Sequence, residues 1–426
     1  MNVTQATNWI HSRLKFGIKP GLDRVYAILD LLDNPQEKTA FIHIAGTNGK
    51  GSTTTFIRNI FTKQGLKVGS FTSPYIEKFN ERISIDGIGI PDEKLVEYVQ
   101  KIQPLVAKMD ADEHLKDITE FEIITALAFD YFYHEKVDLA VIEVGLGGLL
   151  DSTNVITPIV SGITTIGMDH MDILGDTLEK IAFQKAGIIK ANTPVVTGNI
   201  QPEALTVIRE VASEKSANMI EYMKDYQIKI QEDTFTYFSK NQEITHLQLS
   251  LLGHHQMENA AMAIEVAKVF AEKMTIELTQ DTIREGLKEA FWPARMEQLR
   301  KTPLVILDGA HNVDAMKRLV ENLQNLYAGK KLYLLFSALE TKDITQMLDE
   351  LATLSNARIY LTTFDYPKAL DLNKYQYLED ERCTIVSDWR FGLAEIMEKM
   401  KEEDVFVITG SLYFSSQVRQ YYLQKS

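Results

Sequence analysis

The sequence predicts an α/β protein built from two domains, and three observations support this fold class. The chain has 426 residues and a mass of 48.4 kDa, which is more than a single hydrophobic core usually serves. Short apolar runs alternate with amphipathic helical runs, a pattern typical of a mostly parallel sheet covered by helices. Hydrophobic residues make up 45% and charged residues 24% of the chain, with only 11 prolines, so a disordered or low-complexity protein is excluded.

The first domain is expected over residues 1–297 and begins with a strand, a glycine-rich segment and a helix in succession. Its elements are expected, in order, as a strand at 41–45, a helix at 53–64, a strand at 68–72, a helix at 120–134 and strands at 139–144 and 159–164. Alternating apolar and polar residues at 227–230 and 235–238 predict a small antiparallel insertion. We therefore predict a P-loop-type, mostly parallel sheet that carries this insertion.

The second domain is expected over residues 298–426 and is smaller. Its strands are predicted at 303–307, 332–336, 357–361 and 405–408, with helices between them. This alternation predicts a Rossmann-like α/β domain. Charged residues stand on both sides of the predicted boundary, so we expect the reaction in the cleft between the two domains.

The charge and the cysteine content exclude several classes of function. Lys and Arg number 45 against 59 Asp and Glu, and the net charge of −14 argues against nonspecific binding of DNA or RNA. Cys383 is the single cysteine, which excludes an intramolecular disulfide and a multi-cysteine metal cluster. Residues 1–15 lack the apolar core of a signal peptide, and no run approaches the roughly 20 apolar residues of a membrane span. We expect a cytoplasmic protein without nucleic-acid or membrane partners.

The segment at 46–52 predicts a phosphate-binding loop. Gly46 and Gly49 allow the backbone to turn so that successive N–H groups face one anion, and the helix that follows adds the positive end of its dipole. Lys50 supplies a charge for the outer phosphates, and the hydroxyl of Ser52 or Thr53 can approach a magnesium ion. The strict G-x-x-x-x-G-K-[ST] pattern is not met, because its first glycine is missing and Gly51 separates the lysine from the hydroxyl. A glycine-rich turn without a ligand is the alternative, which the strand, lysine, hydroxyls and helix together disfavour.

Other charged residues follow predicted strands. Glu143 ends the strand at 139–144, where a carboxylate can contact magnesium, and His170 follows the next strand. Taken alone, Glu143 is also explained as a strand-end carboxylate that points to solvent, and His170 as a hydrogen-bonded structural histidine. Lys185 is ambiguous on its own, since most lysines are solvated. In the second domain the segment at 308–312 follows the first strand, and Arg295, at the junction of the two predicted domains, can reach an anionic phosphate.

Short motifs occur in order across almost the whole chain. They are GTNGKGS at 46–52, TSP at 72–74, FNERI at 79–83, TEFE at 119–122, EVGLGG at 143–148, DSTN at 151–154, DH at 169–170, LG at 174–175, KAGI at 185–188, WPAR at 292–295, DGAHN at 308–312 and TGSLY at 409–413. This set resembles the folylpolyglutamate synthases and the related dihydrofolate synthases of the Mur ligase superfamily. Within that family, the glycine after the lysine of the phosphate loop is the usual form.

The resemblance implies a ligase that uses ATP to activate a folate or pteroate carboxylate as an acyl phosphate, which the amine of L-glutamate then attacks. It implies Mg²⁺, ATP as a substrate, L-glutamate, a reduced folate or dihydropteroate, and a monomeric enzyme. The implied ATP contacts are Asn48, Gly49, Lys50, Gly51, Ser52, Asn259, Arg295 and Asp308. The implied metal ligands are Ser73, Glu143, His170 and Lys185, the last after carbamylation by carbon dioxide. The implied catalytic residues are Lys185, His170, Glu143 and His311, and the implied folate contacts are Asp23, Thr119, Phe121, Glu122 and Asp151.

Three positions depart from the family pattern and concern substrate detail rather than reaction class. Leu149 stands where relatives often carry a basic residue, Ala294 where glycine is usual, and Tyr75 where many have histidine. Two other functions stay open, a Mur-type ligase that adds amino acids to a peptidoglycan precursor and a regulatory P-loop ATPase. The loop and the TEFE motif disfavour the first, and the DGAHN motif of the second domain disfavours the second.

Overall fold

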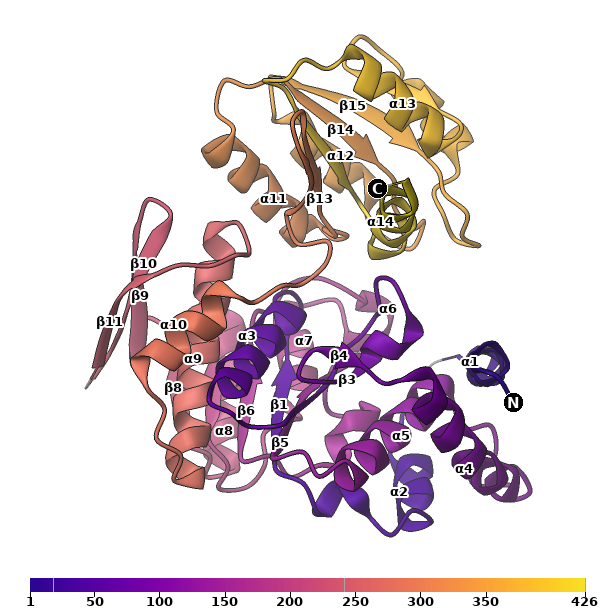
Figure 1. Cartoon of the computed structure of the whole chain (residues 1–426), viewed down its shortest axis with the longest axis vertical. Helices are drawn as coiled ribbons and strands as arrows, with labels where there is room; N and C mark the ends of the chain where they lie inside the picture. The colour runs from indigo at the N-terminus through magenta and orange to yellow at the C-terminus, as the bar shows by residue number, and fades with distance from the viewer. Residues whose placement is uncertain (18, 241, 426) are drawn as a thin grey trace. The chain divides into compact units, whose positions relative to one another are not determined.

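The computed structural model describes residues 1–17, 19–240 and 242–425, which form two compact units (Figure 1). The first unit comprises Met1–Ser250 and Gln256–Phe291, and the second comprises Leu251–His255 and Trp292–Ser426. The division precedes the motif at 292–295, so the boundary expected at 297/298 lies inside the second unit. No helix within the described ranges combines the length and the apolar character that crossing a membrane requires.

The first unit contains an eight-stranded sheet ordered β4-β3-β2-β5-β1-β6-β7-β8. The six strands from β2 to β8 in that order are parallel, and β3 and β4 extend one edge as antiparallel strands. The strands are β1 Phe41–Ala45, β2 Val68–Phe71, β3 Ile83–Ile85, β4 Ile88–Gly89, β5 Leu139–Glu143, β6 Val160–Ile163, β7 Val195–Thr197 and β8 Met219–Glu221. The mostly parallel sheet predicted from the apolar runs is confirmed.

Helices cover both faces of this sheet. They are α1 Val3–His11, α2 Asp23–Asp30, α3 Lys50–Lys63, α4 Asp92–Asp110, α5 Glu120–His134, α6 Met171–Leu174, α7 Leu178–Ala186, α8 Pro202–Glu214, α9 His254–Met274 and α10 Gln280–Lys288. Side chains alternate between the faces of a strand, so Phe41 belongs to the core that includes residues of α1, α2, α4 and α5, while Ile44 points to the other face. There Gly162 of β6 lets Met262 of α9 approach the sheet, since a Cβ at this glycine would lie 2.8 Å from both Ile44 and Met262.

A separate three-stranded antiparallel sheet forms the predicted insertion. Its strands are β9 Tyr226–Gln231, β10 Thr234–Ser239 and β11 Gln242–Leu247, in the order β11-β10-β9. Tyr237 is fully buried and its hydroxyl donates a hydrogen bond to Glu265 of α9. This bond attaches the inserted sheet to the helix that covers the main sheet.

The second unit has a six-stranded sheet ordered β12-β13-β17-β14-β15-β16, in which only β12 is antiparallel. Its elements are β12 Glu297–Lys301, β13 Leu304–Leu307, α11 Val313–Leu326, β14 Leu332–Phe336, α12 Ile344–Ala352, β15 Ala357–Thr362, β16 Cys383–Val386, α13 Trp389–Lys399, β17 Val405–Thr409 and α14 Leu412–Lys425. Strand β17 returns to lie between β13 and β14, so the chain reverses its direction of winding there. This confirms the Rossmann-like prediction and places the ligand-binding edge near the ends of these three strands.

Helix α3 begins one turn earlier than the sequence predicts, because Gly49 serves as its N-cap. Gly49 has a φ of +89°, a conformation that L side chains rarely adopt. A Cβ at this position would lie 2.5 Å from Asn259 Oδ1 of α9. Helix α3 can therefore begin here only because residue 49 is a glycine.

Replacing Gly49 by alanine is expected to destabilise the first unit more than replacing Gly65. Both glycines have a φ of +89°, and this conformation costs an L residue about 1–2 kcal/mol. A Cβ at Gly65 would meet nothing within 4 Å, so only Gly49→Ala adds a clash with Asn259. Urea unfolding of the two variants and the wild type measures the difference, and equal losses of free energy would show that Asn259 moves aside without cost.

Candidate active site

The phosphate loop and three of the implied metal ligands lie at the carboxyl ends of four neighbouring strands of the first unit. The order β2-β5-β1-β6 brings together Ser73 after β2, Glu143 at the end of β5, the loop at 46–49 after β1 and the pair at 169–170 after β6. Glu143 is in register with Ile44, just before the loop begins. Open α/β sheets bind ligands at this edge, where the connections diverge to opposite faces. The topology thus brings together groups that the sequence holds in separate motifs.

The loop after β1 is held in place by the segment that follows β6. Thr47 N donates to Thr165 O at 2.8 Å, and Thr164 Oγ1 donates to Asn48 O at 2.6 Å. Gly46 has a φ of +149°, and a Cβ there would lie 1.8 Å from Thr164 Oγ1, so only glycine fits. Sequence reasoning did not identify Thr164 or Thr165. The available signal was a pair of threonines directly after an apolar strand.

Two lysines converge on one carbonyl oxygen of this loop. Lys50 Nζ donates to Gly46 O at 2.9 Å and to Thr47 O at 3.1 Å, and Lys185 Nζ, from the last turn of α7, donates to the same Gly46 O at 3.0 Å. Lys185 is only 4% exposed. Burial, and next the charge of Lys50, lowers the pKa of Lys185 to about 7, while Asp169 and Asp151 oppose this shift. The structure therefore resolves the ambiguity of Lys185, which is a desolvated lysine beside the phosphate loop.

The three other implied metal ligands differ in their exposure. Glu143 is buried, Ser73 is half-buried, and the side chain of His170 is 47% exposed. His170 begins α6 with a φ of +51°, and its backbone N–H donates to the Asp169 carboxylate at 2.9 Å. Within the described part of the chain, no group of three or more His, Cys, Asp or Glu side chains could hold a metal ion. Because Glu143 and His170 are only two such residues, a magnesium ion here requires further oxygen donors, such as Ser73 and a carbamate on Lys185.

The double-glycine loop after β5 packs against the last turn of α7, which carries Lys185. Leu149 N donates to Gln184 O at 2.7 Å. A Cβ at Gly148 would lie 2.7 Å from Gln184 O and 3.0 Å from Lys185 O, so a side chain there would push the helix away. The double glycine therefore fixes the position of Lys185.

The buried Asp151 shapes the same loop. Its carboxylate accepts hydrogen bonds from Leu146 N at 2.8 Å and from Thr153 N at 3.0 Å. The Thr153 hydroxyl also donates to it, and His43 Nε2 lies 2.8 Å from that hydroxyl. Burial raises the pKa of Asp151, while these hydrogen bonds oppose the shift. Among the implied folate contacts, Asp151 thus has a structural task within the loop, whereas Asp23 is exposed at the start of α2.

The TEFE motif forms the N-terminus of α5. Thr119 caps the helix by accepting from Glu122 N at 3.3 Å, and the Glu122 carboxylate accepts from Thr119 N at 2.7 Å in a capping box. Arg24 Nε also donates to Glu122 at 3.0 Å. Phe121 is half-buried and packs so tightly on Gly145 that a Cβ there would lie 2.4 Å from its ring. The polar groups of Thr119 and Glu122 therefore hold the helix terminus, and Phe121 is the apolar surface of this motif.

In the second unit, Asp308 follows β13 and organises the implied nucleotide residues. Its carboxylate accepts from Met296 N and from Ala310 N, both at 2.9 Å. Burial raises the pKa of Asp308, while the charge of Arg295 opposes the shift. His311 Nδ1 lies 2.8 Å from Gly309 O. Asp308 thus holds the backbone at Met296, which follows Arg295, and at Ala310, which precedes His311.

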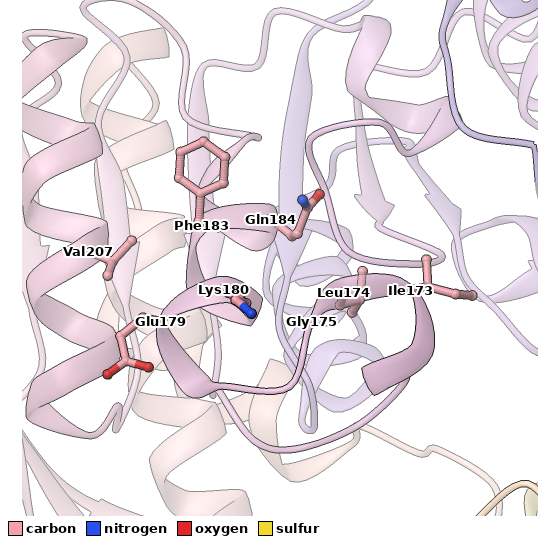
Figure 2. A pocket seen from close by; sticks show the side chains of 8 residues that line it. All are labelled: Ile173, Leu174, Gly175, Glu179, Lys180, Phe183, Gln184 and Val207. Atoms are coloured by element: carbon pink, nitrogen blue, oxygen red, sulfur yellow. The ribbon is translucent and has the colours of Figure 1, made fainter.

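A cavity of about 470 Å³ lies beside α6, as Figure 2 shows. Its walls come from α6, α7 and α8 and are formed by Ile173, Leu174, Gly175, Glu179, Lys180, Phe183, Gln184 and Val207. Gln184 and Leu174 also contact the double-glycine loop. None of the residues implied to bind ATP, metal or folate lines this cavity, which borders the candidate site.

Comparison with known proteins points to the same family as the sequence motifs and covers nearly the whole chain. The Mur ligase middle domain matches residues 44–267, and the Mur ligase glutamate ligase domain matches residues 294–412. The chain is 42% identical to the dihydrofolate synthase/folylpolyglutamate synthase of Bacillus subtilis strain 168, over 97% of this chain and 98% of that protein. The folylpolyglutamate synthase of Mycobacterium tuberculosis solved with ADP has a TM-score of 0.90 and 30% identity, covering 99% of this chain and 98% of the other. A complex of FPGS with AMPPCP and folate has a TM-score of 0.87 and 37% identity, covering 99% of this chain and 100% of the other.

The two domain matches occur in the order that the motifs predicted. The similarity to each of these relatives extends over nearly the full length of both proteins. The chain therefore belongs to the Mur ligase family, among the folylpolyglutamate and dihydrofolate synthases.

Proposed function

We propose that this protein is an ATP-dependent ligase that joins L-glutamate to the carboxylate of a folate in the cytoplasm. The observation that carries this proposal is the convergence of Lys50 and Lys185 on Gly46 O, next to the strand that ends in Glu143. Two lysines and a buried carboxylate around one loop suit the handling of transferred phosphate, where charge neutralisation and positioning supply most of the catalysis.

The reaction has two steps. A folate carboxylate oxygen attacks the γ-phosphorus of ATP, giving an acyl phosphate and ADP. The neutral α-amine of glutamate then attacks the acyl carbon, the amine loses a proton, and phosphate leaves as the amide bond forms. Lys50 holds the phosphates in the first step, and the loop N–H groups and the positive end of the α3 dipole stabilise the negative charge. In the second unit, Arg295, His311 and Asp308 form the remaining contacts to the nucleotide and phosphate.

Magnesium, when bound, neutralises the phosphate charge during transfer. We assign its protein ligands as Ser73, Glu143, His170 and a carbamate on Lys185. The lysine ammonium first loses a proton, and the neutral amine then reacts with carbon dioxide to form an N–C bond and releases a second proton, so that a cation becomes a carboxylate-like anion. The burial of Lys185 and the nearby charge of Lys50 favour the neutral amine that this step requires.

The proposal is tested by measuring phosphate release with purified protein, ATP, Mg²⁺ and L-glutamate. Tetrahydrofolate and dihydropteroate are offered separately, since the B. subtilis relative carries the names of both activities. We expect turnover with tetrahydrofolate, and turnover with dihydropteroate as well would make the enzyme bifunctional. Turnover with neither substrate, together with activity on a UDP-linked muropeptide, would overturn the proposal.

Replacing Lys185 by alanine is expected to lower kcat by at least about a hundredfold, the scale on which removing one preorganised charged group acts. Short-chain carboxylic acids should restore part of the activity by supplying the missing anion. With ¹³C-bicarbonate, a carbamate signal in ¹³C NMR spectra should appear for the wild type and be absent from Lys185→Ala. The control is Lys180→Ala, on the same helix but 62% exposed and paired with Asp176, which should remain active. Full activity of Lys185→Ala would remove the carbamate from the mechanism.

Replacing Glu143 by glutamine is expected to raise the Mg²⁺ concentration that the reaction requires while leaving the size of the side chain nearly unchanged. Mg²⁺ binds carboxylate oxygen more strongly than amide oxygen, so the apparent Mg²⁺ affinity should fall by about tenfold or more. Phosphate release measured across a range of Mg²⁺ concentrations checks this, with EDTA abolishing the wild-type reaction. The exposed Glu179→Gln serves as the control. An unchanged Mg²⁺ curve for Glu143→Gln would exclude Glu143 as a ligand.

A further inference from the structure

The ion pair between Arg82 and Glu120 has no part in the chemistry described above. Arg82 Nη1 donates to Glu120 Oε1 at 2.8 Å, and the two side chains are only 10% and 9% exposed. The pair joins the segment after β2 to the first residue of α5. Buried ion pairs often add little net stability compared with apolar packing, because removing both charges from water is costly. The position of the Arg82–Glu120 ion pair next to the candidate site therefore favours a role other than stabilising the fold.

The guanidinium of Arg82 lies against two aromatic rings. It is 5.8 Å from the ring centroid of Phe121 and 5.8 Å from that of Phe79. The Phe121 ring also contacts Phe71, at 5.7 Å between centroids, and Gly145 of the loop that follows Glu143. The ring is thus held between the end of β2, the loop after β5 and Arg82, all next to the edge that carries Ser73 and Glu143.

The other oxygen of Glu120 anchors the N-terminal helix. His11 Nδ1 of α1 lies 3.3 Å from Glu120 Oε2, and the His11 ring meets Phe79 edge-to-face at 5.4 Å. Glu120 is therefore the point where α1, the segment 79–82 and α5 meet. This arrangement restrains Arg82 from two sides, through its ion pair and through Phe79.

The segment that carries Arg82 is itself tightly ordered. The Glu81 carboxylate accepts hydrogen bonds from Ile76 N at 3.0 Å and from Lys78 N at 3.0 Å, and Thr72 N donates to Arg82 O at 3.0 Å. A rigid backbone on one side and the N-terminus of α5 on the other give the guanidinium a fixed position. A fixed guanidinium can in turn set the orientation of the ring that it contacts.

We propose that Arg82 and Glu120 are positioning residues that hold Phe121 as a fixed platform for the planar ring system of the folate substrate. This inference rests on the proposed function, because it assigns the ring of Phe121 to the folate. Thr119 and Glu122 direct their hydrogen bonds to each other and to Arg24, so the face of Phe121 is what this motif offers to a flat ligand. Since the pair acts on the binding platform and not on the reacting atoms, it controls folate affinity and leaves phosphoryl transfer unaffected.

The test compares steady-state kinetics of Arg82→Met with those of the wild type. We expect KM for tetrahydrofolate to rise by about tenfold to a hundredfold, the scale on which a misplaced binding group acts, while kcat and KM for ATP stay within about twofold. Arg82→Lys keeps the charge but loses the planar contact, so its KM for tetrahydrofolate should lie between that of the wild type and that of Arg82→Met. This second variant also provides the measurement if Arg82→Met fails to fold.

A double-mutant cycle with Phe121→Ala separates positioning from general stability. If Arg82 acts through Phe121, the double variant should have the same KM for tetrahydrofolate as Phe121→Ala alone. The matched control is Lys101→Met, which breaks a 2.6 Å ion pair to the buried Asp130 at the other end of α5. Its effect on KM for tetrahydrofolate should be within about twofold and should add to that of Phe121→Ala.

Two results would overturn the inference while leaving the proposed function intact. One is an active wild type whose Arg82→Met variant raises KM for ATP as much as KM for tetrahydrofolate. The other is an Arg82→Met effect that multiplies with that of Phe121→Ala. A wild-type protein that joins glutamate to no folate would instead overturn the proposed function, and the assignment of Phe121 with it.

Discussion

The first unit depends on how closely the loop after β1 approaches its neighbours. Gly46 lies against Thr164 and Gly49 against Asn259 at distances that leave no room for a single methyl group. This contact turns Gly46 O to a position that both Lys50 and Lys185 reach. The absence of two side chains thus determines where two lysine side chains lie, and the low pKa of Lys185 follows from its burial and from the nearby charge of Lys50.

Both units use a buried aspartate to shape a loop that follows a strand. Asp151 accepts backbone N–H groups in the first unit, and Asp308 does so in the second. Burial raises the pKa of each carboxyl group, and hydrogen bonds from the backbone offset part of that cost. Replacing either aspartate would therefore change the geometry of its loop, whether or not that aspartate contacts a substrate.

Much of the fold could be predicted because the parallel strands are short apolar runs that end in polar residues. Glu143 was found in this way, at the end of a continuous apolar strand. Contacts between distant segments could not be predicted, since no local pattern encodes which residues meet. Arg82 and Glu120 are 38 residues apart, and Thr164 is 116 residues from Asn48. The sequence predicts the start of α3 too late, because the helix begins at a glycine cap rather than at the first run of helix-forming residues.

The motif residues also differ in what their side chains do, since some hold the backbone and others present a surface, and the sequence alone does not reveal this. Thr119 and Glu122 match the family pattern, yet their side chains close a capping box at the start of α5. Such residues are required by the backbone, whether or not a substrate touches them. Phe121, between them, is held by Arg82, Phe71 and Gly145 and presents a ring rather than hydrogen-bonding groups.

The capping box has a consequence for inhibitor design. A hydrogen-bond donor aimed at the buried Glu122 carboxylate would compete with Thr119 N and Arg24, which already bind it. A flat, uncharged ring laid on Phe121 would meet no such competition. Compounds against this enzyme should therefore take their affinity at α5 from shape and stacking, and place their polar groups elsewhere.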